Sequence, residues 1–192
     1  MFKSDTVLFL SLFILITLGL LVLWSISFQD QPSFLSVKKQ LIFLGISIGF
    51  FIVFSLLDWR IFNNSSLILF LYFLSLGLLV LVLFFGDKSS GSAGWFNFGF
   101  FSFQPVEVAK IALLLVLAKY LSSRHLEIWQ WQHLLVSGFF ALIPFCLTAI
   151  QPDLGGALSF FIIWLGLVLI SGIRIKQIIL LLIVFSLVGG LA

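Results

Sequence analysis

The run "VLFLSLFILITLGLLVLW" (residues 7–24) contains no charged side chain and, as a helix, is long enough to cross the hydrocarbon core of a bilayer. Comparable runs recur, and they predict spans at about 7–27, 40–57, 66–86, 105–121, 134–150, 154–173 and 177–192. Lipid offers backbone groups no hydrogen-bond partner, and the sequence lacks the alternating pattern of a β-barrel. The sequence therefore predicts an all-α, polytopic transmembrane helix bundle of about seven spans.

The composition predicts a membrane protein without a separate water-soluble domain. Hydrophobic residues make up 62% of the 192 residues and charged residues 9%, against about 25% charged residues in soluble domains. We expect a single transmembrane domain over residues 1–192. The final stretch "SLVGGLA" has no polar flank, so we expect the front part of a larger polytopic protein, interrupted within its seventh span.

The basic residues stand at the ends of the predicted spans and form no stripe, which argues against nucleic-acid binding. One side of the membrane would hold Lys3, Arg60, Lys119, Arg124, Arg174 and Lys176, and the other Lys38, Lys39 and Lys88. The positive-inside rule then predicts a cytoplasmic N-terminus. Cys146 is the only cysteine, which excludes an internal disulfide and a cysteine metal cluster.

The connections between the spans differ in character. Residues 58–64 form a short cytoplasmic turn, in which we expect Asn63 and Asn64 to act as turn residues and no more. The outer stretch at 86–105 begins with Gly and Ser and continues with dense aromatic residues, so we expect it to lie on or dip into the outer membrane surface. Most of these aromatic residues are expected to form an interfacial belt, and Trp95 is the one that best suits a lipid or sugar groove.

The segment "FQPVEVAK" (103–110) carries two opposite charges into an apolar helix. Glu107 and Lys110 are three residues apart, so they share one helix face and are expected to pair. Glu107 would also favour the positive end of a helix that starts at Pro105, as a purely structural capping acid. That alternative does not explain Lys110, a cation near the same end, and ionisable residues within spans often mark functional sites.

A second segment, "AIQPDLGGAL" (149–158), repeats the arrangement of Gln, Pro and acid. Gln104 precedes Pro105 as Gln151 precedes Pro152, and Asp153 stands at the outer start of the next span. Capping and function are both open for Asp153. Together the two segments predict a small polar cluster near the outer face of the bilayer, suited to a ligand with a polar head and an apolar tail.

The remaining polar motifs predict no further site. Glycines 155 and 156 are expected to allow close helix packing. The spacing of His125, Glu127 and His133 matches no common metal motif, so we predict no metal site. No cofactor is identified, and the requirement for a divalent cation is left open.

Three longer segments resemble the shape, elongation, division and sporulation (SEDS) family, closest to its rod-shape branch: residues 94–125, 143–158 and 162–174. The resemblance implies a ten-span protein of the bacterial inner membrane, a peptidoglycan glycosyltransferase that polymerises lipid II for cell-wall elongation and cell shape. Its implied partners are lipid II, undecaprenyl-diphosphate-linked glycan and a class B penicillin-binding protein.

The resemblance also implies roles for the residues that match the family motifs. Glu107, Lys110 and Asp153 would line the outer cavity, supported by Trp95, Gln104 and Gln151, with Lys110 facing the diphosphate. The central catalytic carboxylate is expected in an outer loop beyond residue 192, so residues 1–192 alone are expected to be inactive. Gly94 and Val106 depart from the family pattern, which often shows Arg and Ser there.

Two other functions fit a charged cluster in a polytopic bundle. The first is a transporter that flips lipid-linked cell-wall precursors, because intramembrane charges also mark translocation paths. The second is a non-catalytic scaffold for the transmembrane helix of the penicillin-binding protein.

Overall fold

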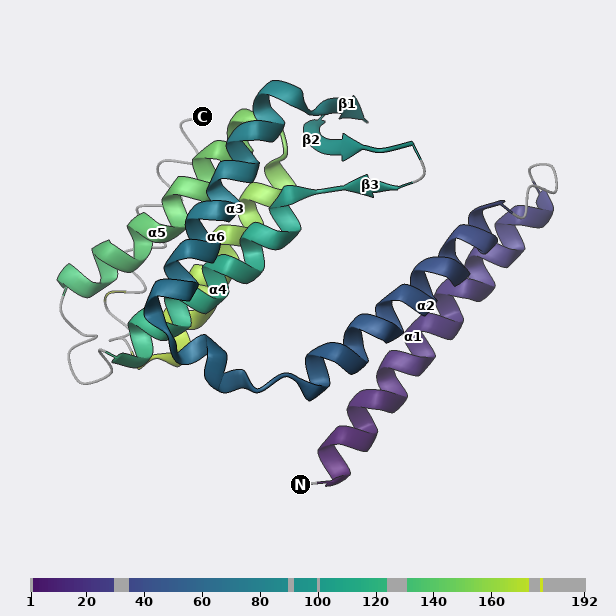
Figure 1. Cartoon of the computed structure of the whole chain (residues 1–192), viewed down its shortest axis with the longest axis horizontal. Helices are drawn as coiled ribbons and strands as arrows, with labels where there is room; N and C mark the ends of the chain where they lie inside the picture. The colour runs from purple at the N-terminus through teal and green to yellow at the C-terminus, as the bar shows by residue number, and fades with distance from the viewer. Residues whose placement is uncertain are drawn as a thin grey trace. The chain divides into compact units, whose positions relative to one another are not determined.

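The computed structural model describes residues 2–29, 35–89, 92–99, 101–123, 131–172 and 177. The chain divides into two compact units, Met1–Asp58 and Trp59–Ala192 (Figure 1). Within the described ranges almost all residues belong to helices, which confirms the all-α class. The predicted seventh span lies outside the described residues except for Gln177.

The first unit is a pair of long helices, α1 (Phe2–Gln29) and α2 (Leu35–Leu56). They run antiparallel, because Phe9 near the start of α1 packs edge-on against Phe51 near the end of α2, with ring centroids 5.8 Å apart. None of the apolar window of either helix is buried inside the structure. Such all-round hydrophobicity with exposed side chains is typical of helices that lie in lipid.

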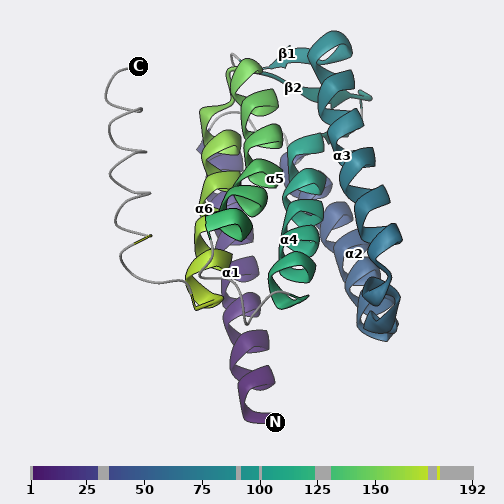
Figure 2. The ribbon, with the colours of Figure 1, turned by 90° about the vertical axis from the view of Figure 1, so that its left-hand side faces the viewer.

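The second unit begins with a 3₁₀ helix, η1 (Trp59–Asn63), followed by α3 (Ser65–Phe85) and α4 (Pro105–Ser123). It continues with α5 (Trp131–Ile150) and α6 (Leu154–Ile170). The four α-helices lie side by side as a bundle (Figure 2). Their bounds differ from those of the corresponding predicted spans by only a few residues.

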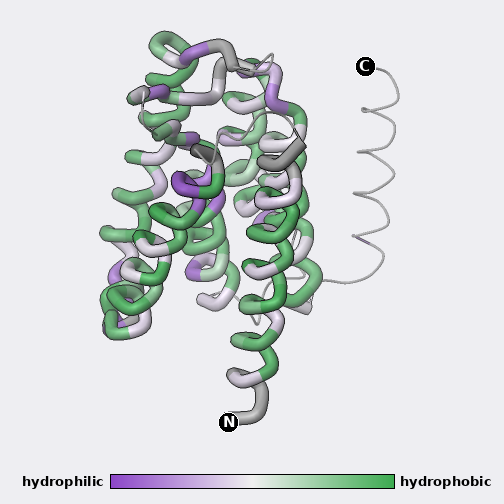
Figure 3. The backbone as a smooth tube through the Cα atoms, turned by 90° about the vertical axis from the view of Figure 1, so that its right-hand side faces the viewer, coloured by the Kyte–Doolittle hydropathy of each residue, from purple (hydrophilic) through white to green (hydrophobic). Residues whose placement is uncertain are grey.

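Four of the described helices are long and apolar enough to cross a membrane, with spans at Thr6–Ser25, Val37–Leu56, Ser65–Phe85 and Trp131–Ile150. Hydrophobic residues cover most of their length, and hydrophilic ones gather near the helix ends (Figure 3). Helix α6 is shorter, and α4 carries Glu107, Lys110 and Lys119. Both nevertheless pack within the same bundle as α3 and α5, so the polytopic helical architecture is confirmed.

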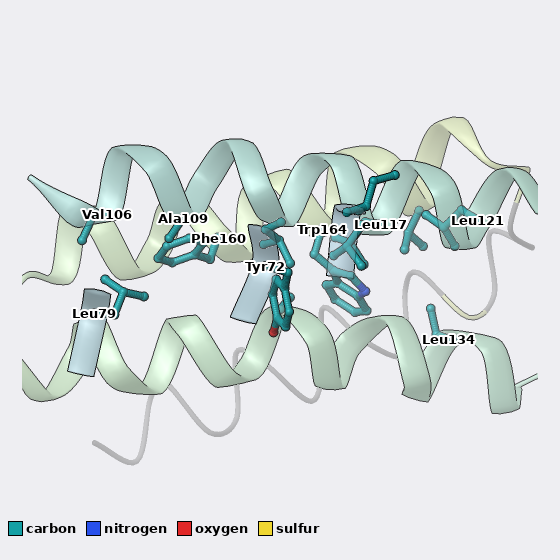
Figure 4. Packing of buried hydrophobic residues seen from close by; sticks show 14 residues of the cluster. Tyr72, Leu79, Val106, Ala109, Leu117, Leu121, Leu134, Phe160 and Trp164 are labelled. Atoms are coloured by element: carbon teal, nitrogen blue, oxygen red, sulfur yellow. The ribbon is translucent and has the colours of Figure 1, made fainter. Parts of the chain in front are cut away.

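The core of the second unit lies where α3, α4, α5 and α6 meet. Buried residues from all four helices form one cluster, which includes Tyr72, Leu79, Val106, Leu117, Leu134, Phe160 and Trp164 (Figure 4). The Trp164 indole donates a hydrogen bond to the Ser137 hydroxyl at 3.1 Å, so its polar atom is satisfied inside the core. This packing holds the ends of the four helices in fixed positions.

Helix α5 contains an internal proline whose missing hydrogen bond is replaced from another helix. Pro144 has no N–H, so it leaves the carbonyl of Phe140 without its usual helical donor. The Tyr72 hydroxyl of α3 donates to that carbonyl at 2.7 Å, and the phenol points toward α5 in Figure 4. Tyr72 therefore stabilises α5 at the turn that the proline weakens.

The stretch at residues 86–105 contains a small antiparallel sheet that the sequence did not predict. Its strands are β1 (Asp87–Ser89), β2 (Ser92–Asn97) and β3 (Ser102–Phe103), in the order β1-β2-β3. Strand β2 pairs with both neighbours. The dense aromatic residues that suggested a membrane surface also have high strand propensity.

The turn before α3 does more than reverse the chain, so the prediction for Asn63 and Asn64 was wrong. The Asn64 side chain caps α3 by accepting from the Ser66 N–H at 3.0 Å. The Lys119 ammonium donates to the Asn63 carbonyl at 3.0 Å and to its side-chain oxygen at 2.7 Å. These bonds hold the last turns of α4 against the start of α3.

Candidate functional site

The candidate site lies at the end of the second unit where α3 ends, α4 begins and α5 turns into α6 (Figure 1). Strand β2 packs against α3 and α4 there. All six residues predicted for the site belong to these segments: Trp95, Gln104, Glu107, Lys110, Gln151 and Asp153. The helix bundle therefore brings together two motifs that are about forty residues apart in the sequence.

The predicted pair on α4 is confirmed. The Lys110 ammonium lies 2.7 Å from Glu107 Oε1, as an ion pair between residues three apart. The Lys110 side chain is 24% exposed and the Glu107 side chain 60% exposed. The Lys110 side chain is thus the less exposed of the two, and the more exposed Glu107 carboxylate binds its amine.

Asp153 is the N-cap of α6, as the structural alternative predicted. Its Oδ1 accepts from the Gly156 N–H at 2.8 Å. A side chain at Gly156 would clash, because a Cβ there would lie 2.5 Å from Asp153 Oδ2. Gly156 is therefore required for the cap itself, which is a more specific role than the predicted helix packing.

Asp153 also makes a contact that a cap does not need. The Gln104 amide, just before α4, donates to Asp153 Oδ2 at 3.3 Å. The two oxygens of one carboxylate thus connect the start of α4 to the start of α6. Pro152 directly precedes Asp153 in the turn between α5 and α6. Its φ is positive, at 28°, a value that proline rarely adopts.

Gln151 lies inside the protein, not on the surface of the site. Its side chain is fully buried, and its amide donates to the Leu79 carbonyl of α3 at 3.0 Å. Its other polar atom, Oε1, accepts no hydrogen bond from the described residues. A direct contact between Gln151 and a ligand would require the surrounding helices to move.

Trp95 lies on β2 and is partly exposed, at the register position opposite Asp87 of β1. Asp87 was not among the predicted site residues. The sequence signal for it was weak, because a lone acid in a Gly/Ser stretch resembles a solvated turn. The strand pairing places this exposed acid beside the aromatic residue, at the rim of the candidate site.

The predicted single cluster consists of two separate polar contacts in the described structure. One is the Glu107–Lys110 ion pair, and the other is the bond between Gln104 and Asp153. No described contact joins Lys110 to Asp153. Each pair has one member at the start of α4, because Gln104 directly precedes the helix and Glu107 lies in its first turn.

The histidine motif is only partly described. His133 Nδ1 lies 3.0 Å from the Tyr120 hydroxyl and its side chain is buried, whereas His125 and Glu127 lie outside the described residues. Within the described ranges, no group of three or more His, Cys, Asp or Glu side chains is arranged to hold a metal ion.

The first unit contains an apolar groove of about 660 Å³ between α1 and α2. Its polar lining groups are Gln40 and Ser47, and none of the predicted site residues lines it. The groove lacks charged side chains, so it offers no chemistry comparable to that at the end of the second unit.

Comparison with known families gives a match along nearly the whole chain. The FtsW/RodA/SpoVE family, described as cell cycle proteins, matches residues 5–191. A relative from Tolumonas auensis, named probable peptidoglycan glycosyltransferase FtsW, is 34% identical to this chain. The alignment covers 86% of this chain and 44% of the relative. Stage V sporulation protein E of Bacillus subtilis is 30% identical to this chain, and the alignment covers 91% of this chain and 50% of that protein.

Solved structures show the same fold. A structure of the rod shape determining protein RodA of Thermus thermophilus has a TM-score of 0.72 and 31% identity, covering 90% of this chain and 55% of that chain. A chain of a peptidoglycan synthase complex has a TM-score of 0.73 and 29% identity to this chain. The structure of that complex is described as showing the coordination of polymerization and crosslinking. The present chain spans about half the length of these relatives.

Proposed function

Because the chain belongs to the FtsW/RodA/SpoVE family of cell cycle proteins, we propose that its protein is a peptidoglycan glycosyltransferase that polymerises lipid II into glycan strands. Relatives carry the name peptidoglycan glycosyltransferase, which supports this activity. The observation that carries the proposal is the Glu107–Lys110 pair, since a partly protected cation is held where two polar motifs converge.

In the proposed reaction, the 4-hydroxyl of one disaccharide attacks the anomeric carbon of another and undecaprenyl diphosphate leaves. Negative charge develops on the leaving diphosphate, and a fixed cation stabilises it. Lys110 supplies that cation, and Glu107 orients its amine. Asp153 and Gln104 are available for the saccharide. We assign the role of general base on the attacking hydroxyl to none of these residues.

The proposal extends to the cellular location of the protein and to its partners. The protein is a multi-pass membrane protein, and we place its N-terminus in the cytoplasm on the charge distribution of the connections. The similarity to a chain of a peptidoglycan synthase complex supports a class B penicillin-binding protein as partner. We propose a role in cell-wall elongation, supported by the similarity to RodA.

The relatives named FtsW favour division instead, so depletion of the protein in its host decides between the two roles. Rounded cells would support elongation, and filaments would show that the protein acts in division.

The activity is tested with the complete protein, purified and supplied with lipid II in detergent or vesicles. Glycan strands formed without another glycosyltransferase support the proposal. Movement of lipid II across vesicles without strand formation would identify a flippase. Partner binding without either activity would identify a scaffold.

The role of Lys110 is tested by Lys110→Ala, which we expect to lower kcat about 100-fold, the effect of removing one electrostatic group that stabilises developing charge. Lys119→Ala is the matched control, because Lys119 belongs to the same helix and is also hydrogen-bonded, but lies near the opposite end of α4. Equal activities of the two variants would remove Lys110 from the mechanism.

A further inference from the structure

The side chain of Gln151 is an unusual feature of the core. It is fully buried, although buried amide groups normally use both their N–H donors and their carbonyl oxygen in hydrogen bonds. Burial of an amide that has only part of its bonds disfavours folding. An apolar residue of the same size would avoid this cost, so we looked for a contact that only the amide of Gln151 makes.

The amide end of Gln151 joins the α5–α6 turn to α3. Its Nε2 donates to the carbonyl of Leu79, a residue of α3 that is itself fully buried. A backbone carbonyl has two lone pairs, so the Leu79 carbonyl accepts this bond in addition to its bond within the helix. The contact is between residues 72 positions apart, which makes it a tertiary tie.

The oxygen end of Gln151 faces the outer sheet. Gly94 of β2 lies against it, because a Cβ built at Gly94 would be 3.5 Å from Gln151 Oε1. Gly94 directly precedes Trp95, and Gln151 is two residues before Asp153. The carboxamide therefore occupies the space between the two segments that carry these site residues.

We propose that Gln151 is a positioning residue: its buried carboxamide holds the α5–α6 turn, with Asp153, in a fixed position relative to strand β2, with Trp95. This inference rests on the proposed function for its catalytic consequence, but not for its structural part. Gln151 acts through Asp153 and Trp95 and does not itself touch the ligand.

Two substitutions separate this role from simple packing. Gln151→Met keeps a side chain of similar length and removes the donor to Leu79. Thr148→Val is the matched control, because Thr148 is also fully buried in the last turn of α5 and its hydroxyl makes no hydrogen bond to the described residues. Removal of that hydroxyl leaves no broken contact.

The position of the sheet is measured by pulsed electron spin resonance between two nitroxide labels. Replacement of Cys146, the only cysteine, by Ser gives a background in which Phe98→Cys and Leu154→Cys carry the labels. Both sites are exposed, at 61% and 70%; Phe98 directly follows the last residue of β2, and Leu154 is the first residue of α6. We expect one narrow distance distribution, unchanged by Thr148→Val and broadened by Gln151→Met.

An unchanged distribution in Gln151→Met overturns the inference, whether or not the natural protein polymerises lipid II. In the unlabelled protein, we expect Gln151→Met to lower kcat about 100-fold with KM changed little, the effect of a misplaced catalytic group. A broadened distribution with full kcat overturns the catalytic consequence. If the natural protein makes no glycan, the proposed function fails and the distance measurement still decides the structural part.

A second variant covers the case in which Gln151→Met does not fold. Gly94→Ser places a hydroxyl beside Gln151 Oε1, where a Cβ makes only an ordinary contact. The hydroxyl would donate to Oε1, which accepts no hydrogen bond from the described residues, so we expect a higher unfolding temperature. A lower unfolding temperature would show that Oε1 does not face β2 as an available acceptor, and would overturn the inference.

Discussion

At the scale of single residues, Asp153 serves two purposes that one carboxylate can combine. Oδ1 caps α6 through the Gly156 N–H, and Oδ2 accepts from Gln104 across the site. The cap requires only an acceptor atom, which Asn also provides, whereas attraction of a cation or a saccharide depends on the charge. Substitution at this residue can therefore separate stability from activity.

We expect Asp153→Asn to keep the free energy of unfolding within about 0.5 kcal/mol of the natural value, since Asn and Asp are comparable caps. Asp153→Ala is expected to lower it by about 1 kcal/mol, because the cap is lost. Both variants are expected to make less glycan from lipid II. Chemical unfolding in detergent and the polymerisation assay measure the two effects, and full activity of Asp153→Asn would reduce Asp153 to a cap.

The site residues differ in how far the sequence predicts their contacts. The Glu107–Lys110 pair follows from helix geometry alone, because residues three apart share a face. The bonds of Gln151 to Leu79 and of Lys119 to Asn63 are tertiary contacts between distant segments. Local periodicity carries no information on which helices are neighbours, so the sequence placed Gln151 in the site and missed its burial.

At the scale of elements, the helices were predictable and the sheet was not. Long apolar runs leave no alternative to helices in lipid, and helix bounds follow from where the runs end. The strands β1, β2 and β3 are short, and their aromatic residues also suit a membrane interface. Composition therefore decides the helices, whereas the pairing of the strands depends on the bundle that supports them.

The proline in α5 makes a further prediction at this scale. Tyr72→Phe leaves the Phe140 carbonyl without a donor, because Pro144 has no N–H to offer it. We expect a loss of about 1 kcal/mol in the free energy of unfolding. In a Pro144→Ala background the restored N–H of residue 144 bonds that carbonyl, so Tyr72→Phe is expected to have a smaller effect.

A double-mutant cycle of these two substitutions, measured by unfolding in detergent, gives the coupling directly. Additive effects would show that the Tyr72 hydroxyl does not compensate for Pro144. The bond supports α5, the helix that leads to Gln151.

At the scale of the whole molecule, α4 decides the topology. It carries Glu107, Lys110 and Lys119 and is not among the four described helices that satisfy the criteria for a membrane span. One face of it nevertheless packs against α3, α5 and α6, where residues such as Leu113 and Leu117 are fully buried, while Ile111 on another face is exposed. A protein environment of this kind lets a helix cross a bilayer with polar residues that face away from lipid.

If α4 crosses the membrane, the residues before and after it lie on opposite sides. Phe98, on the chain that leads to α4, and Ser123, its last residue, are both exposed. In a Cys146→Ser background, we expect a membrane-impermeant maleimide to label Phe98→Cys in intact spheroplasts and Ser123→Cys only after permeabilisation. The reverse pattern would place the N-terminus outside and the Glu107–Lys110 pair on the cytoplasmic side of the membrane. Labelling of both residues from one side would show that α4 does not cross.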